Sequence, residues 1–304
     1  MTVRFAIDCE LDYRVESPTE FLFNVQAAAV AQQTLLNETL LLTGASSISQ
    51  HVHRESGNRF VRASAACGRL TLEYSTTLFL EHTVIPTSDV AETTVAELPH
   101  EVLPFVLPSR YCESDRLSGL AHSVFGNLPP GYARVEAVCD WVHGQMRFAP
   151  GTTDSRTSAA DALAQGAGVC RDFAHVTIAL LRSLNIPARF VTGYDYGVDP
   201  SYGPTDFHAY VEAFLENRWW IFDSTRLCPR NGLVRIGTGR DAADVAFATI
   251  FGNIRFHGMR LDIRPVDAVI VDPGGMALST AAASTTPEPG MHSISSANDE
   301  RMVA

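Results

Sequence analysis

The chain has 304 residues, which is enough for one large domain or two of ordinary size. Hydrophobic residues make up 46% and charged residues 19%, a composition typical of a globular protein with a substantial core. The net charge of −11 argues against a nucleic-acid-binding protein, which needs a basic face, and against attachment to an anionic membrane through basic clusters.

Neither an export signal nor a membrane-spanning segment is expected. The N-terminus lacks the apolar stretch of a signal peptide, because Asp8, Glu10 and Asp12 interrupt it early. No uninterrupted apolar run of about 18 residues predicts a transmembrane helix. The six cysteines are widely spaced and are therefore expected to be free thiols in the cytoplasm. They include no CxxC pair, so no structural zinc site is expected.

Residues 1–86 are predicted to form an N-terminal β-sandwich domain. The segments 5–15, 33–42 and 59–85 alternate apolar and polar residues or are rich in Thr, Val, Phe and Tyr, and glycines between them supply turns. Residues 87–108 are expected to be a linker, since several prolines in and beside this stretch argue against a continuous helix or a central strand.

From about residue 109 the pattern becomes helical, and residues 109–271 are predicted to form a second, catalytic domain. Helices are expected over residues 109–125, 132–146 and 159–165. The next helix, over residues 170–184, is apolar on nearly every side. Such a helix should be buried in the middle of its domain.

Strands are predicted after this buried helix. Residues 188–194 form one strand, and residues 207–215 and 218–222 form a hairpin joined by a tight turn. A further strand is expected within residues 259–271. Residues 272–304 are rich in Ser, Thr, Ala, Gly and Pro and are expected to be a disordered tail.

Cys170 is the candidate nucleophile. It follows the glycine-rich residues 166–168 and begins the buried helix. The free N–H groups and the dipole at a helix N-terminus favour a thiolate, and the same amides can donate to a developing oxyanion. A cysteine is also a common small buried residue, so this alternative stays open when Cys170 is considered alone.

His208 and Asp223 lie on the two strands of the predicted hairpin. Taken singly, His208 could be an ordinary strand residue and Asp223 a turn former. The turn, however, places Asp223 opposite or diagonal to His208, where the two side chains can meet. A carboxylate there can hold the imidazole tautomer and stabilise the imidazolium, and a neighbouring thiol would complete a catalytic triad.

Four segments occur in an order and spacing that resemble the bacterial transglutaminase-like proteins. They are Gly168-Val-Cys-Arg-Asp-Phe-Ala-His175, Ile186-Pro-Ala-Arg-Phe-Val-Thr-Gly-Tyr194, Phe207-His-Ala-Tyr-Val-Glu-Ala-Phe214 and Trp219-Trp-Ile-Phe-Asp-Ser-Thr225. The resemblance covers about residues 109–265, and the N-terminal β region resembles the domain that often accompanies this core. It implies an α+β fold with a papain-like, transglutaminase-like core, in which the nucleophile helix packs against an antiparallel sheet. In this resemblance Cys170, His208 and Asp223 match the triad position by position.

Two positions depart from the family pattern. Ser224 stands where many relatives have proline, and little consequence is expected. Arg171 stands where relatives often carry glutamine, and it is expected to alter the charge of the pocket beside the nucleophile. Of the neighbouring residues, Asp172 is expected to be structural, in the first turn of the helix. His175 does not share a helix face with the nucleophile, so a role in the core or in support of the site is expected.

The expected activity is that of a cysteine-dependent hydrolase of the peptidase or amidase type. Cys170 would attack the carbonyl of a peptide, protein or small amide, His208 would accept and return the proton, and Asp223 would orient His208. An acyl-enzyme would form, and no metal or organic cofactor would be required. Two alternatives stay open, namely transfer of the acyl group to an amine, as in a transglutaminase, and a non-catalytic protein-interaction module. No oligomeric state is predicted.

Overall fold

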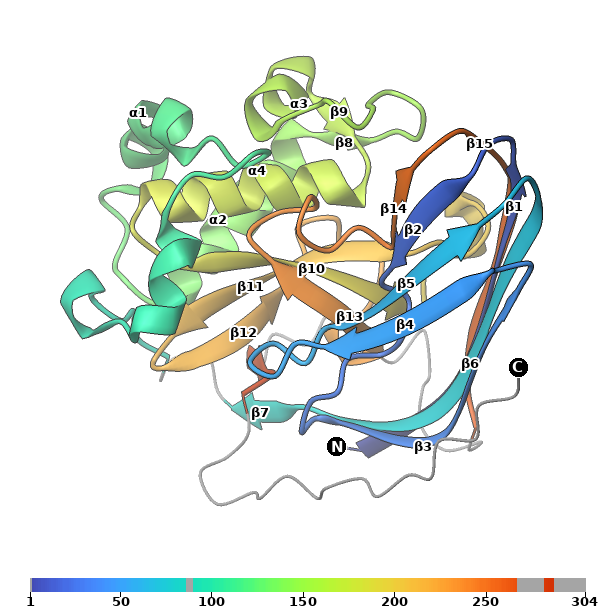
Figure 1. Ribbon diagram of the computed structural model, residues 1–304. Coiled ribbons are helices and arrows are strands. Elements are labelled where there is room, and N and C mark those ends of the chain that lie inside the picture. Colours follow the sequence, from blue (N-terminus) through green and yellow to red (C-terminus); the bar gives the residue numbers. More distant parts are fainter. Residues whose placement is uncertain (1, 86–89, 267–281, 287–304) are drawn as a thin grey trace.

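The computed structural model describes residues 2–85, 90–266 and 282–286. Within these residues the chain forms two four-stranded sheets, one six-stranded sheet and a parallel pair of short strands, β8 (Arg147–Phe148) and β9 (Ala167–Gly168). Figure 1 shows the two four-stranded sheets side by side at one end of the molecule and the helices gathered over the six-stranded sheet at the other. Among the described residues, none of the helices combines the length and the apolar character that crossing a membrane requires.

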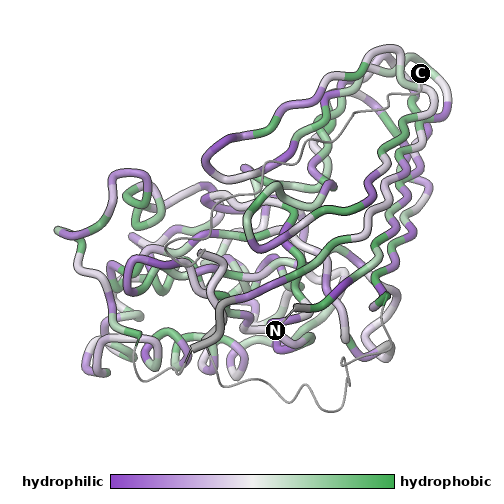
Figure 2. The backbone as a smooth tube through the Cα atoms, turned by 90° about the horizontal axis from the view of Figure 1, so that it is seen from below, coloured by the Kyte–Doolittle hydropathy of each residue, from purple (hydrophilic) through white to green (hydrophobic). Residues whose placement is uncertain are grey.

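The two four-stranded sheets are antiparallel. Across the first sheet the strands are β15 (Ile254–Pro265), β1 (Thr2–Val15), β6 (Gly68–Glu81) and β3 (Gln33–Thr43). Across the second they are β14 (Ala248–Phe251), β2 (Thr19–Phe23), β5 (Arg59–Ala65) and β4 (Ser47–Val52). Buried side chains alternate with more exposed ones along β1 and β6, because successive side chains of a strand point to opposite faces. Figure 2 shows the same alternation of hydrophobic and hydrophilic residues along the long strands.

The apolar faces of these two sheets pack on each other. The ring of Tyr13, from β1, lies 5.4 Å from the ring of Phe21 and 6.0 Å from that of Phe23, both on β2. Fully buried aliphatic residues such as Leu72 fill the remaining space between the sheets. The predicted N-terminal β-sandwich is therefore confirmed.

The six-stranded sheet is also antiparallel. Its strands, in order, are β13 (Leu233–Gly239), β10 (Ala188–Asp195), β11 (His208–Leu215), β12 (Arg218–Phe222), β16 (Ala282–Ser284) and β7 (Thr83–Ile85). The strands β11 and β12 form the predicted hairpin. Its turn residues Glu216 and Asn217 have φ angles of 49° and 58°. A type I′ turn, common in two-residue hairpins, requires positive φ at both of these positions.

Among the described residues, three α-helices lie around a fourth. The outer helices are α1 (Ser114–Phe125), α2 (Tyr132–Gln145) and α3 (Ala159–Gln165), and the central helix is α4 (Cys170–Ser183). One side of α4 packs against β10 and β11, and the other helices cover the rest of it. Residues 172–183 are consequently all buried. The predicted α+β class, with a buried helix against an antiparallel sheet, is confirmed.

Side-chain amides of the sandwich cover the edge strand β13. The Asn58 side chain donates to the carbonyl of Thr238 at 2.8 Å and accepts from its N–H at 2.9 Å. The Gln33 side chain makes the same pair of bonds with the backbone of Arg235, at 2.9 Å and 2.6 Å. An uncovered edge strand would leave these backbone groups without partners, so the two amides join the sandwich to the central sheet.

Strand pairing does not follow the predicted limits of 1–86 and 109–271. The strands β14 and β15 lie within the second range, yet they pair with β2 and β1 of the sandwich. Conversely, β7 lies within the first range and belongs to the six-stranded sheet. The chain thus returns to the sandwich after building the central sheet, and its last long strand pairs along the second edge of β1. The division into two domains stays a prediction.

Short 3₁₀ helices occur at Val95–Glu97, His100–Val106, Pro200–Tyr202 and Arg230–Gly232. The first two are all the helix that forms between residues 90 and 108, in keeping with the prolines of the predicted linker.

The predicted tail, residues 272–304, lies mostly outside the described residues, as does the end of the strand expected over 259–271. For residues 282–284 the expectation of disorder is wrong, since this strand pairs with β12 and β7.

Candidate active site

The N-terminus of α4 is built to hold Cys170 in place. Cys170 is the first residue of the helix, is half-buried, and its Sγ lies 3.9 Å from the carbonyl oxygen of Phe207. The Asp172 carboxylate caps the helix start by accepting from the N–H of Val169 at 2.9 Å. A Cβ at position 168 would lie 2.6 Å from the Cβ of Asp172, so only Gly168 leaves room for this cap. The structural role expected for Asp172 is confirmed.

Arg171 does not act as an open charge in the site. Its guanidinium pairs with the Asp172 carboxylate at 2.8 Å and donates to the carbonyl of Asp154 at 2.8 Å. The side chain therefore ties the start of α4 to the loop before α3. The expectation that Arg171 alters the charge of the pocket is weakened by this pairing, because the neighbouring carboxylate balances the guanidinium.

His208 and Asp223 meet across the hairpin as the turn predicts. The ladder pairs Val211 with Phe222, so its continuation places Asp223 opposite Tyr210 and diagonal to His208. The Nε2 atom of His208 lies 2.9 Å from the Asp223 carboxylate, and both residues are buried. This contact assigns the Nε2 proton to the bond with Asp223 and leaves Nδ1 with its lone pair in the neutral imidazole.

Thr225 completes the surroundings of the Asp223 carboxylate. Its N–H and its hydroxyl both donate to Oδ1 of Asp223, at 2.9 Å and 2.8 Å. Burial by itself would raise the pKa of Asp223, but the charge and hydrogen bond of His208 and the bonds from Thr225 lower it below its usual value. Asp223 is therefore ionised at neutral pH and faces the imidazole as an anion.

The pKa of His208 is raised well above its usual range. Burial alone would lower it, but the Asp223 carboxylate, a hydrogen bond with the Cys170 thiol and the Asp195 carboxylate together more than offset burial. The site thus favours the imidazolium form, which is the form that a proton transfer from a thiol to His208 would produce.

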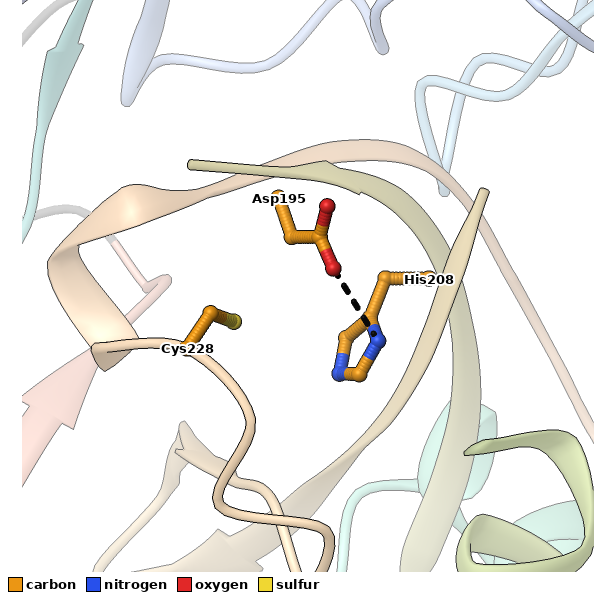
Figure 3. A group of neighbouring side chains, drawn as sticks. All are labelled: Asp195, His208 and Cys228. Atoms are coloured by element: carbon orange, nitrogen blue, oxygen red, sulfur yellow. Dashed lines mark ion pairs between the residues drawn. The ribbon is translucent and has the colours of Figure 1, made fainter. Parts of the chain in front are cut away.

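Sequence reasoning missed two residues beside His208. Asp195, the last residue of β10, has a carboxylate oxygen 3.3 Å from Nδ1 of His208. Cys228, in the segment between β12 and β13, is also buried there. Figure 3 shows the side chains of Asp195, His208 and Cys228 converging. The residue types gave no signal, since Asp195 follows the predicted strand 188–194 and Cys228 belongs to none of the four segments.

Other residues of the four segments support the site. His175 is fully buried, stacks on the ring of Tyr111 at 5.0 Å, and its Nε2 accepts from the N–H of Ala242 at 3.2 Å. The role in the core expected for His175 is confirmed. Ser224 bonds to the hydroxyl of Thr177 on α4 at 2.8 Å, which fixes the chain next to Asp223 against the helix.

Two family models match the chain in succession. Residues 3–101 match the bacterial transglutaminase N-terminal domain, and residues 118–224 match the transglutaminase-like superfamily. The second match contains Cys170, His208 and Asp223.

A solved structure resembles this chain over most of its length. It is a crystal structure from Cytophaga hutchinsonii named "Putative Cysteine Protease", with 40% sequence identity and a TM-score of 0.86. The similarity covers 93% of this chain and 98% of that one, so it includes both the sandwich and the helical core.

Curated relatives are similar over shorter segments. An uncharacterised protein of Mycobacterium leprae is 37% identical over 136 residues, which are 43% of this chain and 48% of that protein. An uncharacterised protein of Mycobacterium tuberculosis is 30% identical over 115 residues, 34% of this chain and 37% of the relative. The chain therefore matches about half or less of the length of these relatives. Together with the full-length structural match, the two family models show that this chain belongs to the transglutaminase-like superfamily and carries the N-terminal domain of bacterial transglutaminases.

Proposed function

We propose that the chain is a cysteine-dependent hydrolase of amide bonds, in which Cys170 is the nucleophile, His208 its base and Asp223 the residue that orients the base. The observation that carries this proposal is the buried contact of 2.9 Å between His208 and Asp223 beside a half-buried thiol at a helix N-terminus. The name of the Cytophaga hutchinsonii structure points in the same direction. Proposed substrates are peptides, proteins or small amides.

Of the two cysteines near His208, Cys170 is the better nucleophile. Cys228 is buried, and burial together with the Asp223 and Asp195 carboxylates raises the pKa of its thiol well above the ordinary range. A thiol in such surroundings is a poor source of thiolate. Cys170, by contrast, is half-exposed and lies where helix N–H groups stabilise a negative sulfur.

The proposed reaction proceeds through an acyl-enzyme. His208 takes the thiol proton of Cys170, and the sulfur attacks the carbonyl carbon of the substrate. The N–H of Cys170, one of the amides that a helix start leaves without an internal partner, would donate to the oxyanion. The imidazolium then gives its proton to the leaving amine, the C–N bond breaks, and a thioester remains on Cys170. Water, deprotonated by His208, releases the acid and restores the thiol.

The acceptor of the acyl group separates this proposal from its alternative. If an amine replaces water in the second step, the product is a new amide, as in a transglutaminase. We place hydrolysis first. A competition between water and an amine probe decides between the two acceptors.

Alkylation by iodoacetamide tests whether His208 activates Cys170. The folded protein is alkylated and then digested, and mass spectrometry of the peptides gives separate rates for Cys170 and for the exposed Cys67. Cys67 serves as an internal reference. At pH 6.5 we expect Cys170 to react faster than Cys67 and to lose this advantage in His208→Ala. Equal rates for both cysteines in the unchanged protein would remove the proposed activation and favour a non-catalytic interaction module.

A peptide library with a biotinylated alkylamine tests the reaction itself. New peptide N-termini that disappear in Cys170→Ala would support hydrolysis. Biotin incorporated into glutamine-containing peptides, with no cleavage, would support acyl transfer instead. Cleavage that persists in Cys170→Ala but is lost in Cys228→Ala would reassign the nucleophile.

A further inference from the structure

A mixed set of metal-binding side chains lies directly beside the proposed nucleophile. Asp195, His208 and Cys228 each offer one ligand atom, and these atoms all lie within 4.8 Å of one another. The residues come from the end of β10, the start of β11 and the segment between β12 and β13. Figure 3 shows that their side chains point into a common space. All three are buried, so the ligand atoms are held by the packing around them.

We propose that Asp195, His208 and Cys228 form a binding site for a thiophilic divalent cation of the Zn²⁺ type, and that a bound cation inhibits the enzyme by occupying His208. The donor set consists of one carboxylate oxygen, one imidazole nitrogen and one sulfur. This is a combination that zinc accepts and that the hard cations Mg²⁺ and Ca²⁺ do not seek. The bound cation would displace the thiol proton that Cys228 otherwise keeps.

The spacing of the ligand atoms suits such an ion. Zinc holds oxygen and nitrogen at about 2.0–2.2 Å and sulfur at about 2.3 Å, so two ligands of a tetrahedral ion lie about 3.3–3.6 Å apart. The carboxylate of Asp195 and Nδ1 of His208 are already separated by 3.3 Å. The rest of the set, with separations of up to 4.8 Å, needs to contract by at most about 1.5 Å.

The second nitrogen of the imidazole has the partner that a metal-bound histidine needs. Nε2 of His208 lies 2.9 Å from the carboxylate of Asp223. When a metal binds Nδ1, this contact fixes the tautomer and the ring orientation and raises the basicity of the ligand. The same Asp223 that would orient His208 for catalysis would therefore also orient it for the metal.

The carboxylates beside His208 are balanced better by a divalent cation than by a single proton on the imidazole. The carboxylate of Asp195 lies 3.3 Å from Nδ1 of His208, and that of Asp223 lies 2.9 Å from Nε2. Two carboxylates thus flank one imidazole. With these carboxylates ionised, a single imidazolium leaves the site negative, and a divalent cation offsets the excess.

Inhibition follows from which atom the cation takes. In the neutral imidazole, Nδ1 of His208 is the nitrogen left with a lone pair when Nε2 bonds Asp223, so it is the atom that would accept the thiol proton of Cys170. A metal on Nδ1 removes that lone pair. Three protein ligands leave a fourth position of the ion open, which water can fill.

Co²⁺ used as a spectroscopic stand-in for zinc identifies the sulfur ligand. We expect one equivalent of Co²⁺ to give the sulfur-to-metal charge-transfer absorption of a tetrahedral site, and we expect this band to vanish in Cys228→Ser. Cys139→Ser, which changes another buried cysteine, should keep it. A band that survives in Cys228→Ser but disappears in Cys170→Ser would overturn the proposal, because the metal would then bind the Cys170–His208 pair alone.

Zinc affinity, measured against a chromophoric chelator, tests the carboxylate and needs no catalytic activity. We expect Asp195→Asn to weaken Zn²⁺ binding by about 100-fold or more. Asp206→Asn removes a nearby charge of the same sign without removing a ligand, so it should have a much smaller effect. Equal losses in both variants, or no stoichiometric binding to the unchanged protein, would overturn the site.

The rate of Cys170 alkylation with and without Zn²⁺ tests the inhibition. Each variant serves as its own reference, since only the ratio of the two rates is compared. We expect Zn²⁺ to slow alkylation at least about tenfold, reversibly with EDTA, and to lose this effect in Cys228→Ser. Tight zinc binding without protection of Cys170 would refute the inhibitory role, whereas a slow and zinc-independent thiol would instead count against the proposed catalytic function.

Discussion

The β-sandwich and the six-stranded sheet bury their strands in different ways. Along β6 of the sandwich, buried and more exposed residues alternate, so only one face of the strand is covered. Along β11 and β13 of the central sheet every residue is buried, because α4 packs against β11 and the sandwich packs against β13. A sheet covered on both faces must bury whatever polar residues it carries, and those residues must find partners inside the protein.

The ion pairs of the two regions differ in burial accordingly. In the sandwich, Arg69 pairs with Asp12 on a solvent-exposed face, where such a pair contributes little to stability. In the central sheet, the Glu212 carboxylate is fully buried and pairs with Arg189 at 2.5 Å and with Arg235 at 3.4 Å. Burial by itself would raise the pKa of Glu212, yet the two guanidinium groups lower it. Polar groups are thus fixed in position in the central sheet, and the proposed triad lies at the end of this same sheet.

The largest expected effect is on the catalytic rate, and it should appear only when the central sheet is changed. Removing the proposed base with His208→Ala should lower kcat/KM by about 10²–10⁴-fold on any substrate that the peptide library yields. The matched variant His51→Ala changes an exposed histidine of the sandwich and should leave the rate unchanged. Steady-state kinetics of the two variants, with circular dichroism to confirm folding, make the comparison. A loss below about threefold in His208→Ala would contradict the proposed base.

Next in size is an effect on stability alone. Leu72→Ala opens a cavity in the sandwich core and should lower the free energy of unfolding by about 2–5 kcal/mol. Leu41→Ala, on the exposed side of β3, should cost much less. Urea unfolding gives both values. If Leu72→Ala also slows Cys170 alkylation in the folded protein by more than about tenfold, the packing of the sandwich core helps to hold the active site in its reactive geometry.

Removing the Asn58 amide tests the junction between the regions. Asn58→Ala leaves the N–H and the carbonyl of Thr238 without their partners at the edge of β13, which should cost about 1–3 kcal/mol of unfolding free energy. Asn37→Ala, at an exposed position of β3, is the control and should change stability by less than about 0.5 kcal/mol. Hydrogen exchange at Thr238 should rise only in the first variant; unchanged exchange there would mean that the Asn58 amide is not what protects this N–H.

The smallest effect is expected on the pH dependence of stability: the free energy of unfolding should fall gradually in acid. Burial lowers the pKa of His175 to about 3 and that of His82 to about 4, below their usual value of 6.5. The unfolded chain therefore binds more protons between these values and 6.5, so stability is complete above pH 6.5 and falls as the pH decreases below it. The slope is at most about 1.4 kcal/mol per pH unit for each histidine.

Urea unfolding at pH 7, 6 and 5 measures this slope. In His175→Phe, which keeps a ring against Tyr111, the part of the slope due to His175 should disappear while that of His82 persists. An identical slope in the variant and the unchanged protein would show that His175 is not the titrating group.

Much of the candidate site was predictable because its parts are local. The β11–β12 hairpin has a two-residue turn, and the period of two along each strand then fixes which side chains are diagonal. This is why the contact of His208 with Asp223 could be expected from the sequence. The buried character of α4, and the position of Cys170 at its start, likewise follow from about four turns of apolar sequence.

Contacts between distant segments were not predictable in the same way. Asp195 and Cys228 reach His208 only because β10 pairs with β11 and because the segment after β12 folds back over the sheet. No periodicity links these positions. The same holds for β15, which was expected as a strand but whose partner, β1, lies at the other end of the sequence.

The sequence by itself determined the local parts of this protein: the strand alternation of the sandwich, the buried helix, the hairpin and the family to which their motifs are similar. The tertiary structure decided which strands complete which sheet, that Arg171 is neutralised by Asp172, and that a carboxylate and a second thiol lie beside His208. The physical reason is the distance along the chain over which each interaction acts. Backbone geometry and side-chain periodicity act over a few residues, whereas the charge and the ligands around a buried side chain depend on every segment packed against it.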